Sequence, residues 1–277
     1  MFFVNLTLRA VKNDPDKLAA FLARGVNAEL GMDPVLMDAT DAAWHRDMAA
    51  RLADAGVRAA VHLPFFDLQP GSADALIRRA TRERLLRAAD LAALYDPAHL
   101  VGHASYDPLL YVRSYDQWME RSLETWGAML AAWPEHPPLH LENTFEFRPG
   151  MVTRLVEALR ARCGPRVGIC MDVGHWHSFA GGSARDDLDA WLDAFAPLVT
   201  HTHLHDNDGA ADQHKGLGRG AIPWQAFFEG LAARGLTPSV TFEPHGEDAF
   251  TDSMEFVRAN PHWFDRLGVR PPENGAG

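Results

Sequence analysis

Acidic and imidazole side chains recur where apolar segments of this 277-residue chain give way to loops. The densest short example is the Asp172-Val173-Gly174-His175 segment, which closes the apolar run 167–171. The same change marks five further positions: His62, His103, Glu142, His203 and Glu243. A set of carboxylates and imidazoles without cysteine suits Zn²⁺, Mn²⁺ or a similar divalent cation. These residues therefore predict a divalent-metal site.

Each of these residues, taken singly, also has a structural interpretation. Asp172 could cap the following loop, and Glu142 could form a salt bridge with a neighbouring helix. A lone histidine at the end of a strand, such as His62 or His103, is more often structural than a ligand. Repetition favours the metal site, because random placement rarely puts seven acidic or imidazole residues at six consecutive strand ends.

The segment 200–208 is dense in potential ligands. Alternation along a strand sends His201, His203 and His205 to the same side. We expect His203 to reach the metal site and His201 to lie in the core. His205 would serve the rim of the site or a position behind the ligands.

The loop that follows carries two more features. Asp212 and His214 form another pair of a carboxylate and an imidazole, which is a weak motif by itself. The glycine-rich run 216–220 is not a dinucleotide-binding motif, because no strand immediately precedes it. Lys215 and Arg219 beside it would bind a phosphate or carboxylate of the substrate, or would be solvated cations.

Alternating apolar and amphipathic segments predict the elements that position these residues. Short apolar runs predict eight strands: Phe2–Leu8, Val26–Leu30, Val57–Leu63, His99–His103, Leu139–Asn143, Val167–Asp172, Val199–Leu204 and Ser239–Glu243. Longer segments predict eight helices: Asp16–Arg24, Asp41–Ala55, Ala73–Leu94, Ser114–Ala132, Met151–Arg162, Asp186–Phe195, Trp224–Arg234 and Thr251–Ala259. This α/β alternation fits a single (β/α)8 TIM barrel. Since the loops after its strands open on one face, residues far apart in sequence can meet there.

The boundaries between segments support one continuous domain. Glycines at 25, 56, 164 and 235 each follow a predicted helix and precede the next strand, as helix-ending glycines do. We expect one barrel domain over residues 1–269. The tail 270–277, rich in proline and glycine, is expected to be loose.

Composition narrows the class of partner. The formal net charge of −11 argues against non-specific binding to nucleic acid or to an anionic membrane. The N-terminal apolar segment is too short for a signal peptide, and no run approaches the ~18 apolar residues of a membrane span. Cys163 and Cys170 indicate two thiols in a reducing compartment rather than a disulfide framework. We expect a cytoplasmic protein.

At these residues the chain resembles the xylose isomerase-like TIM barrel superfamily. That superfamily contains sugar phosphate isomerases and epimerases and the endonuclease IV-type AP endonucleases. The likeness runs from about Phe2 to about Pro261. It is carried by the segments Val61–Phe65, Leu141–Thr144, Asp172–His175, His203–Asp206, Asp212–His214 and Leu217–Gly220.

The resemblance implies a ligand set for each branch of the superfamily. In the isomerase and epimerase branch, one metal would be held by Glu142, Asp172, His203 and Glu243. The endonuclease branch implies a site for more than one ion, with further ligands in addition to those four: His62, His103, His175, Asp212 and His214. This chain has a candidate at every position.

The resemblance also implies a reaction, namely isomerisation or epimerisation of a sugar or sugar phosphate. A proton would be transferred through a metal-stabilised enediolate. Glu142 and Glu243 would flank the substrate, one removing the proton and the other returning it, and His175 would position a substrate oxygen. Arg219 replaces the acid of the usual Leu-Gly-Glu-Gly turn, and its positive charge would suit an anionic substrate.

Two other functional classes stay open. A multinuclear-zinc phosphodiesterase of the AP endonuclease kind would use the whole ligand set to activate water and clamp a leaving oxygen. Against it stand the negative net charge and the lack of an obvious loop rich in arginine and aromatic residues. A sugar-binding barrel without catalytic activity is the third class. The sequence leaves open the sugar, the metal and a homo-oligomeric state.

Overall fold

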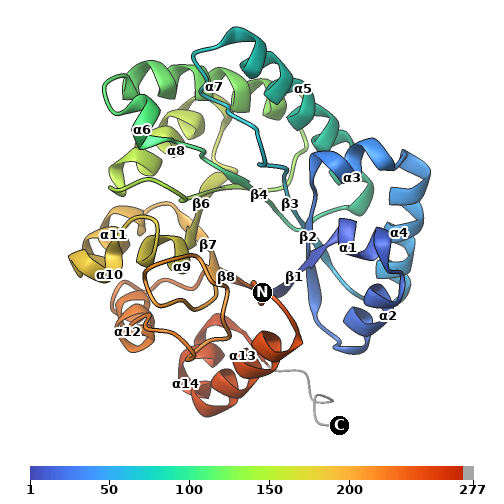
Figure 1. Cartoon of the computed structure of the whole chain (residues 1–277), viewed down its shortest axis with the longest axis vertical. Helices are drawn as coiled ribbons and strands as arrows, with labels where there is room; N and C mark the ends of the chain where they lie inside the picture. Colours follow the sequence, from blue (N-terminus) through green and yellow to red (C-terminus); the bar gives the residue numbers. More distant parts are fainter. Residues whose placement is uncertain (271–277) are drawn as a thin grey trace.

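Eight parallel strands close into a barrel in the order in which they occur along the chain (Figure 1). The computed structural model describes residues 1–270. The strands are β1 (Phe2–Thr7), β2 (Asn27–Gly31), β3 (Ala59–His62), β4 (Leu100–His103), β5 (Leu139–Glu142), β6 (Val167–Asp172), β7 (Val199–Leu204) and β8 (Ser239–Phe242). β1 pairs with β8 and completes the ring, so the predicted (β/α)8 barrel is confirmed.

Helices surround the strands on the outside (Figure 1). Those that correspond to the eight predicted helices are α2 (Asp16–Ala23), α4 (Ala42–Asp54), α5 (Ala75–Ala92), α7 (Tyr115–Ala132), α8 (Gly150–Cys163), α11 (Leu188–Phe195), α12 (Trp224–Ala233) and α13 (Glu247–Ala259). Fully buried tryptophans such as Trp118, Trp126 and Trp191 lie on these helices, and they belong to the packed core.

The structure also contains short helices that periodicity does not predict, four of which directly follow a strand. They are α1 (Leu8–Asn13), α3 (Pro34–Ala39), α6 (Pro108–Tyr111), α9 (Val173–His177), α10 (Gly182–Arg185) and α14 (Pro261–Phe264), with 3-10 turns at Ala93–Tyr95 and Asp265–Leu267. Asp33 and Asp107 cap α3 and α6 through their side chains, and a proline follows each. Capping chemistry, rather than an apolar stripe, therefore specifies these two helices.

Strand register brings the chemically active positions level with one another at one end of the barrel. His103 on β4 pairs with Glu142 on β5, and Asp172 on β6 pairs with His203 on β7. Because all strands are parallel, these positions share the carboxyl-terminal end, which we call the mouth.

Among residues 1–270, no helix has the length and apolar character needed to cross a membrane. Except for Arg270, the predicted loose tail lies outside the described residues.

Candidate metal centre

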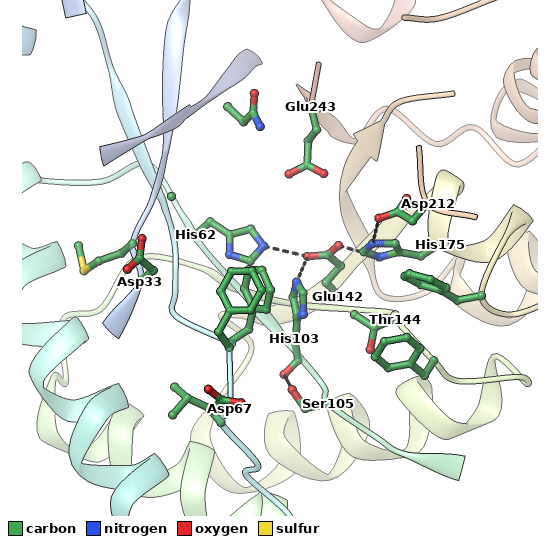
Figure 2. A pocket seen from close by; sticks show the side chains of 18 of the residues that line it. Asp33, His62, Asp67, His103, Ser105, Glu142, Thr144, His175, Asp212 and Glu243 are labelled. Carbon is green, nitrogen blue, oxygen red and sulfur yellow. Dashed lines mark hydrogen bonds and ion pairs between the residues drawn. The ribbon is translucent and has the colours of Figure 1, made fainter. Parts of the chain in front are cut away.

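Glu142, the last residue of β5, is the centre of a buried group of imidazoles at the mouth (Figure 2). One of its carboxylate oxygens lies 3.1 Å from His62 Nε2 and 3.3 Å from His103 Nε2. The other lies 3.1 Å from His175 Nδ1. Carboxylate oxygens and imidazole nitrogens are ligands of divalent cations such as Zn²⁺, so this group would offer ligands to such an ion.

His203 connects this group to the other side of the mouth. Its Nδ1 lies 3.4 Å from Glu243 Oε1, 3.5 Å from Glu142 Oε1 and 3.9 Å from Asp172 Oδ2. Neither ring nitrogen of His203 has a hydrogen-bond partner among residues 1–270, although His203 is wholly buried. An unsatisfied imidazole nitrogen among three carboxylates fits a divalent cation, since such a cation would accept all four as ligands.

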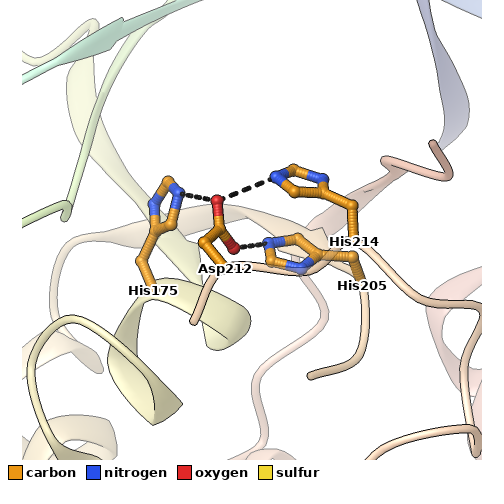
Figure 3. Close-up of side chains that lie close together, drawn as sticks. All are labelled: His175, His205, Asp212 and His214. Carbon is orange, nitrogen blue, oxygen red and sulfur yellow. Dashed lines mark hydrogen bonds and ion pairs between the residues drawn. The ribbon is translucent and has the colours of Figure 1, made fainter. Parts of the chain in front are cut away.

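A third group surrounds Asp212 (Figure 3). Asp212 Oδ2 lies 3.0 Å from His214 Nε2 and 3.4 Å from His175 Nε2, and Oδ1 lies 3.6 Å from His205 Nε2. The ligand atoms of a tetrahedral zinc site, with bonds of about 2.0–2.1 Å, lie roughly 3.3 Å apart. These spacings therefore suit a zinc ion or a cation of similar size.

The proton affinities of these groups reflect the pairing of carboxylates with imidazoles. Burial alone would raise the pKa of Glu142, but His103 and His203 hold that pKa well below its ordinary value. Burial opposes protonation of His214, yet Asp212 raises the pKa of that imidazole to about 9. His175 likewise has a pKa well above the ordinary value because of Asp172 and the carboxylates around it. Metal binding at this centre would consequently release protons from the imidazoles.

The ends of β5 and β6 are held together by one side chain. Asn143 donates from its amide nitrogen to the Asp172 carbonyl at 2.9 Å, and its oxygen accepts from the Asp172 N–H at 3.0 Å. The Asp172 carboxylate then accepts the His175 N–H at 2.6 Å and caps α9. Asp172 therefore caps α9, as one interpretation of the sequence expected, and it also lies among the candidate ligands.

Gly174 makes room for a further imidazole. A Cβ at this position would lie 1.9 Å from Cε1 of His205, so only glycine allows that ring to pack here. His205 Nε2 lies 3.2 Å from Asp172 Oδ2. His205 therefore lies between Asp172 and Asp212, and it belongs to the group His175, His205, Asp212 and His214 whose ligand atoms lie close enough together to hold a metal ion.

A single buried carboxylate anchors the loop that carries Asp212 and His214. Asp206 Oδ1 accepts the N–H of Asn207 at 2.9 Å and of Ile222 at 3.2 Å. Its Oδ2 accepts the Gly218 N–H at 2.9 Å and the Trp224 indole N–H at 2.8 Å. Two backbone hydrogen bonds with Lys215 close the loop at its other end.

A cavity of about 660 Å³ opens above the candidate ligands. Phenylalanines line it next to the imidazoles: Phe65 stacks on His103 with ring centres 4.0 Å apart, and Phe179 stacks on His175 at 5.3 Å. Arg9 also lines the cavity, and its Nε lies 3.3 Å from Asp33 Oδ2. A substrate would therefore meet polar ligands at the floor and aromatic rings at the side.

The structure brings together all nine predicted metal ligands: His62, His103, Glu142, Asp172, His175, His203, Asp212, His214 and Glu243. It does not bring the two predicted substrate-binding cations to the cavity. Lys215 pairs with Asp208, and Arg219 pairs with Asp252 and Glu255 on the exposed side of α13. Asp208 on the same loop and the two acids on α13 hold these side chains away from the mouth.

Sequence reasoning missed Glu29. This glutamate lies inside β2, is 1% exposed, and lies 2.9 Å from His203 Nε2. It precedes the strand end by two residues, so a search of strand ends passes over it. An acidic residue between the apolar Ala28 and Leu30 of this strand was the available signal.

Fold and site together define a parallel (β/α)8 barrel whose mouth gathers imidazoles and carboxylates from six strands and the loops that follow them. The chain belongs to the xylose isomerase-like TIM barrel family, whose model matches residues 24–260.

Among individual proteins, the uncharacterized protein MJ1311 of Methanocaldococcus jannaschii is 28% identical over 191 residues. That match covers 68% of this chain and 64% of MJ1311, and a match to the uncharacterized protein y4fM of Sinorhizobium fredii covers 29% of that protein. The structure of the TTHB071 protein from Thermus thermophilus, obtained by soaking with ZnCl2, is 27% identical. Its TM-score is 0.73, with 93% of this chain and 96% of that chain covered.

A D-tagatose 3-epimerase-like protein is 20% identical with a TM-score of 0.71, and the match covers 96% of this chain and 98% of that chain. At this identity the likeness shows the shared fold.

Proposed function

We propose that the protein is a divalent-metal-dependent isomerase or epimerase of a sugar or sugar phosphate. One observation carries the proposal: Glu142 and Glu243 approach the same nitrogen of His203, at 3.5 and 3.4 Å, from strands that are not neighbours. Both glutamates line the cavity, and Figure 2 shows both carboxylates directed into its interior. Two carboxylates on different sides of one bound substrate can serve as a base and an acid.

The comparisons support this class of reaction. The similar structures include the D-tagatose 3-epimerase-like protein and a D-psicose 3-epimerase determined in the presence of D-fructose, which is 15% identical with a TM-score of 0.71. The ZnCl2 soak of TTHB071 supports zinc as one candidate metal.

The chain's own residues have distinct parts in the proposed reaction. A divalent ion held by Glu142, Asp172, His203 and Glu243 would supply Lewis-acid stabilisation of negative charge on the substrate. Glu142 is held in its ionised form by His103 and His203, against the effect of burial, so it can accept a proton from carbon. Glu243 would return a proton on the other side, and His175 would position a substrate oxygen. Phe65 and Phe179 would keep bulk water from the reacting atoms.

Solvent isotope exchange tests the two glutamates. In deuterated water, the metal-loaded parent is expected to exchange the acidic carbon-bound proton of at least one member of a panel of ketoses and ketose phosphates. Glu142→Gln and Glu243→Gln should each lose that exchange, because a carboxamide accepts no proton from carbon. Glu229→Gln, on the surface of α12, is the control and should retain it. Full exchange in both active-site variants would refute the assignment.

A multinuclear-zinc phosphodiesterase is a second candidate function, and a separate observation favours it. The groups His62–His103–Glu142 and His175–Asp212–His214 are both complete, as a multinuclear phosphodiesterase would require. Zinc stoichiometry and cleavage of abasic DNA distinguish the candidates. Three tightly bound zinc ions per chain together with such cleavage would replace the isomerase proposal.

A further inference from the structure

A buried carboxylate lies inside the barrel, beneath the ligands at the mouth. Glu29 comes from the middle of β2. Its Oε2 accepts the Thr241 hydroxyl at 2.7 Å and lies 3.1 Å from His99 Nε2 and 3.2 Å from His201 Nε2. Its Oε1 instead lies 2.9 Å from His203 Nε2, a contact with the distance of an ion pair, and neither atom has a hydrogen-bond partner among residues 1–270. The two oxygens of one carboxylate therefore face different partners, the first a buried polar network and the second a candidate metal ligand.

The two nitrogens of His203 are divided in the same way. Nδ1 faces the mouth, where Glu142 and Glu243 approach it, and Nε2 faces down into the barrel toward Glu29. A histidine binds a metal through one nitrogen, and the partner of the other nitrogen fixes the position of its proton and the orientation of the ring. A carboxylate is the strongest such partner, because it accepts the N–H and increases the basicity of the ligand.

We propose that Glu29 is a positioning residue for the metal centre. It holds the proton of His203 on Nε2 and thereby presents Nδ1 to the divalent ion. This inference rests on the metal site of the proposed function, because it requires that His203 binds a metal.

The ionisation of the Glu29 carboxylate is consistent with this positioning role. Burial alone would raise the pKa of Glu29, but His203, His201 and His99 hold that pKa well below its ordinary value. The carboxylate is therefore ionised at neutral pH. Its several partners offset the penalty of burying a negative charge, which an unpaired carboxylate at 1% exposure would not overcome.

If Glu29 had only a structural role, substitutions would have different effects from those expected for a positioning residue. A substitution of Thr241 distinguishes these two roles. Thr241→Val removes one donor to Oε2 with little change in shape, while it leaves Oε1 opposite His203. If Glu29 only holds the polar network together, Thr241→Val and Glu29→Gln should disturb metal binding equally. If Glu29 positions His203, only the Glu29 variants should disturb it.

The experiment is a metal titration of parent, Glu29→Gln, Glu29→Leu and Thr241→Val, each prepared free of metal. Zn²⁺ affinity is measured by competition with a chromophoric chelator, and the visible absorption of Co²⁺ reports the ligand geometry. We expect Glu29→Leu to bind about 10–100-fold more weakly and to show an altered Co²⁺ spectrum. Glu29→Gln should lose less, because its amide oxygen still accepts the N–H. Thr241→Val should match the parent. Circular dichroism of the metal-free proteins verifies folding, and Glu29→Gln carries the test if the leucine variant does not fold.

Three results would overturn the inference. One is parental affinity and spectrum in every variant that folds. Another is an equal loss in Thr241→Val. The third is that Glu29→Gln loses one bound ion while the remaining metal sites keep their affinity. Glu29 would then be a metal ligand and not a positioning residue. No substrate enters the experiment, so a protein that binds metal but converts no sugar contradicts only the proposed function, whereas a parent that binds neither ion contradicts both.

Discussion

Replacing Asp206 by asparagine should loosen the loop that carries Asp212 and His214. Each oxygen of Asp206 accepts two N–H groups, so the amide of an asparagine would face two of these four donors in either orientation. A buried donor that loses its acceptor costs about 1–3 kcal/mol. Two such donors imply a loss of about 2–6 kcal/mol in the free energy of unfolding, a large part of the ~5–15 kcal/mol typical of a domain.

The measurement is urea unfolding of metal-free Asp206→Asn followed by circular dichroism, together with the zinc stoichiometry of the folded variant. Asp208→Asn is the matched control, because Asp208 lies on the same loop, is exposed, and pairs only with Lys215 and Gln213 among the described residues. We expect the control to unfold with the parent and the Asp206 variant to bind less zinc. A parental free energy of unfolding in Asp206→Asn would refute the reasoning about the anchor.

Three further changes have definite expected outcomes. Gly174→Ala should lower the free energy of unfolding by about 1–3 kcal/mol in urea titrations, because the new methyl group meets the ring of His205. Asn143→Ala should weaken zinc binding in a chelator competition, since it removes both hydrogen bonds between the ends of β5 and β6, and unchanged affinity would count against that role. Burial lowers the pKa of His45 to about 4 from an unfolded value of 6.5, so unfolding takes up a proton and stability falls as pH drops from about 6.5 to about 4. His45→Phe should show a smaller fall over that range in urea unfolding, and an identical fall would contradict this source of acid sensitivity.

The ligands that could be placed from the residues alone are those fixed by strand geometry, whereas Asp212 and His214, which lie on a loop, were implied by the family resemblance. A residue at the end of a parallel barrel strand must lie at the mouth, so His103, Glu142 and Asp172 could be placed without coordinates. A loop residue has no such constraint. Arg219 follows a glycine-rich turn, and the acids on α13 that bind it could not be assigned to it from spacing alone.

The sequence did not identify Glu29 as part of the site, although it lies on a predicted strand. Its strand was predicted, but its importance comes from partners on β7 and β8 and from His99 just before β4. These partners are distant in sequence and meet only when the barrel closes. Single-sequence patterns report the periodicity of an element but not which element lies across the interior.

The anchored loop at Asp206 also bears on engineering. Its two ends are joined by the paired backbones of Asp206 and Lys215, and the segment 209–213 between them carries Asp212. Substituting that segment would remove the contacts of Asp212 with His175, His205 and His214, while the acids and imidazoles at the strand ends stay in the chain. Such a variant would separate the contribution of the loop to metal binding from that of the strand ends.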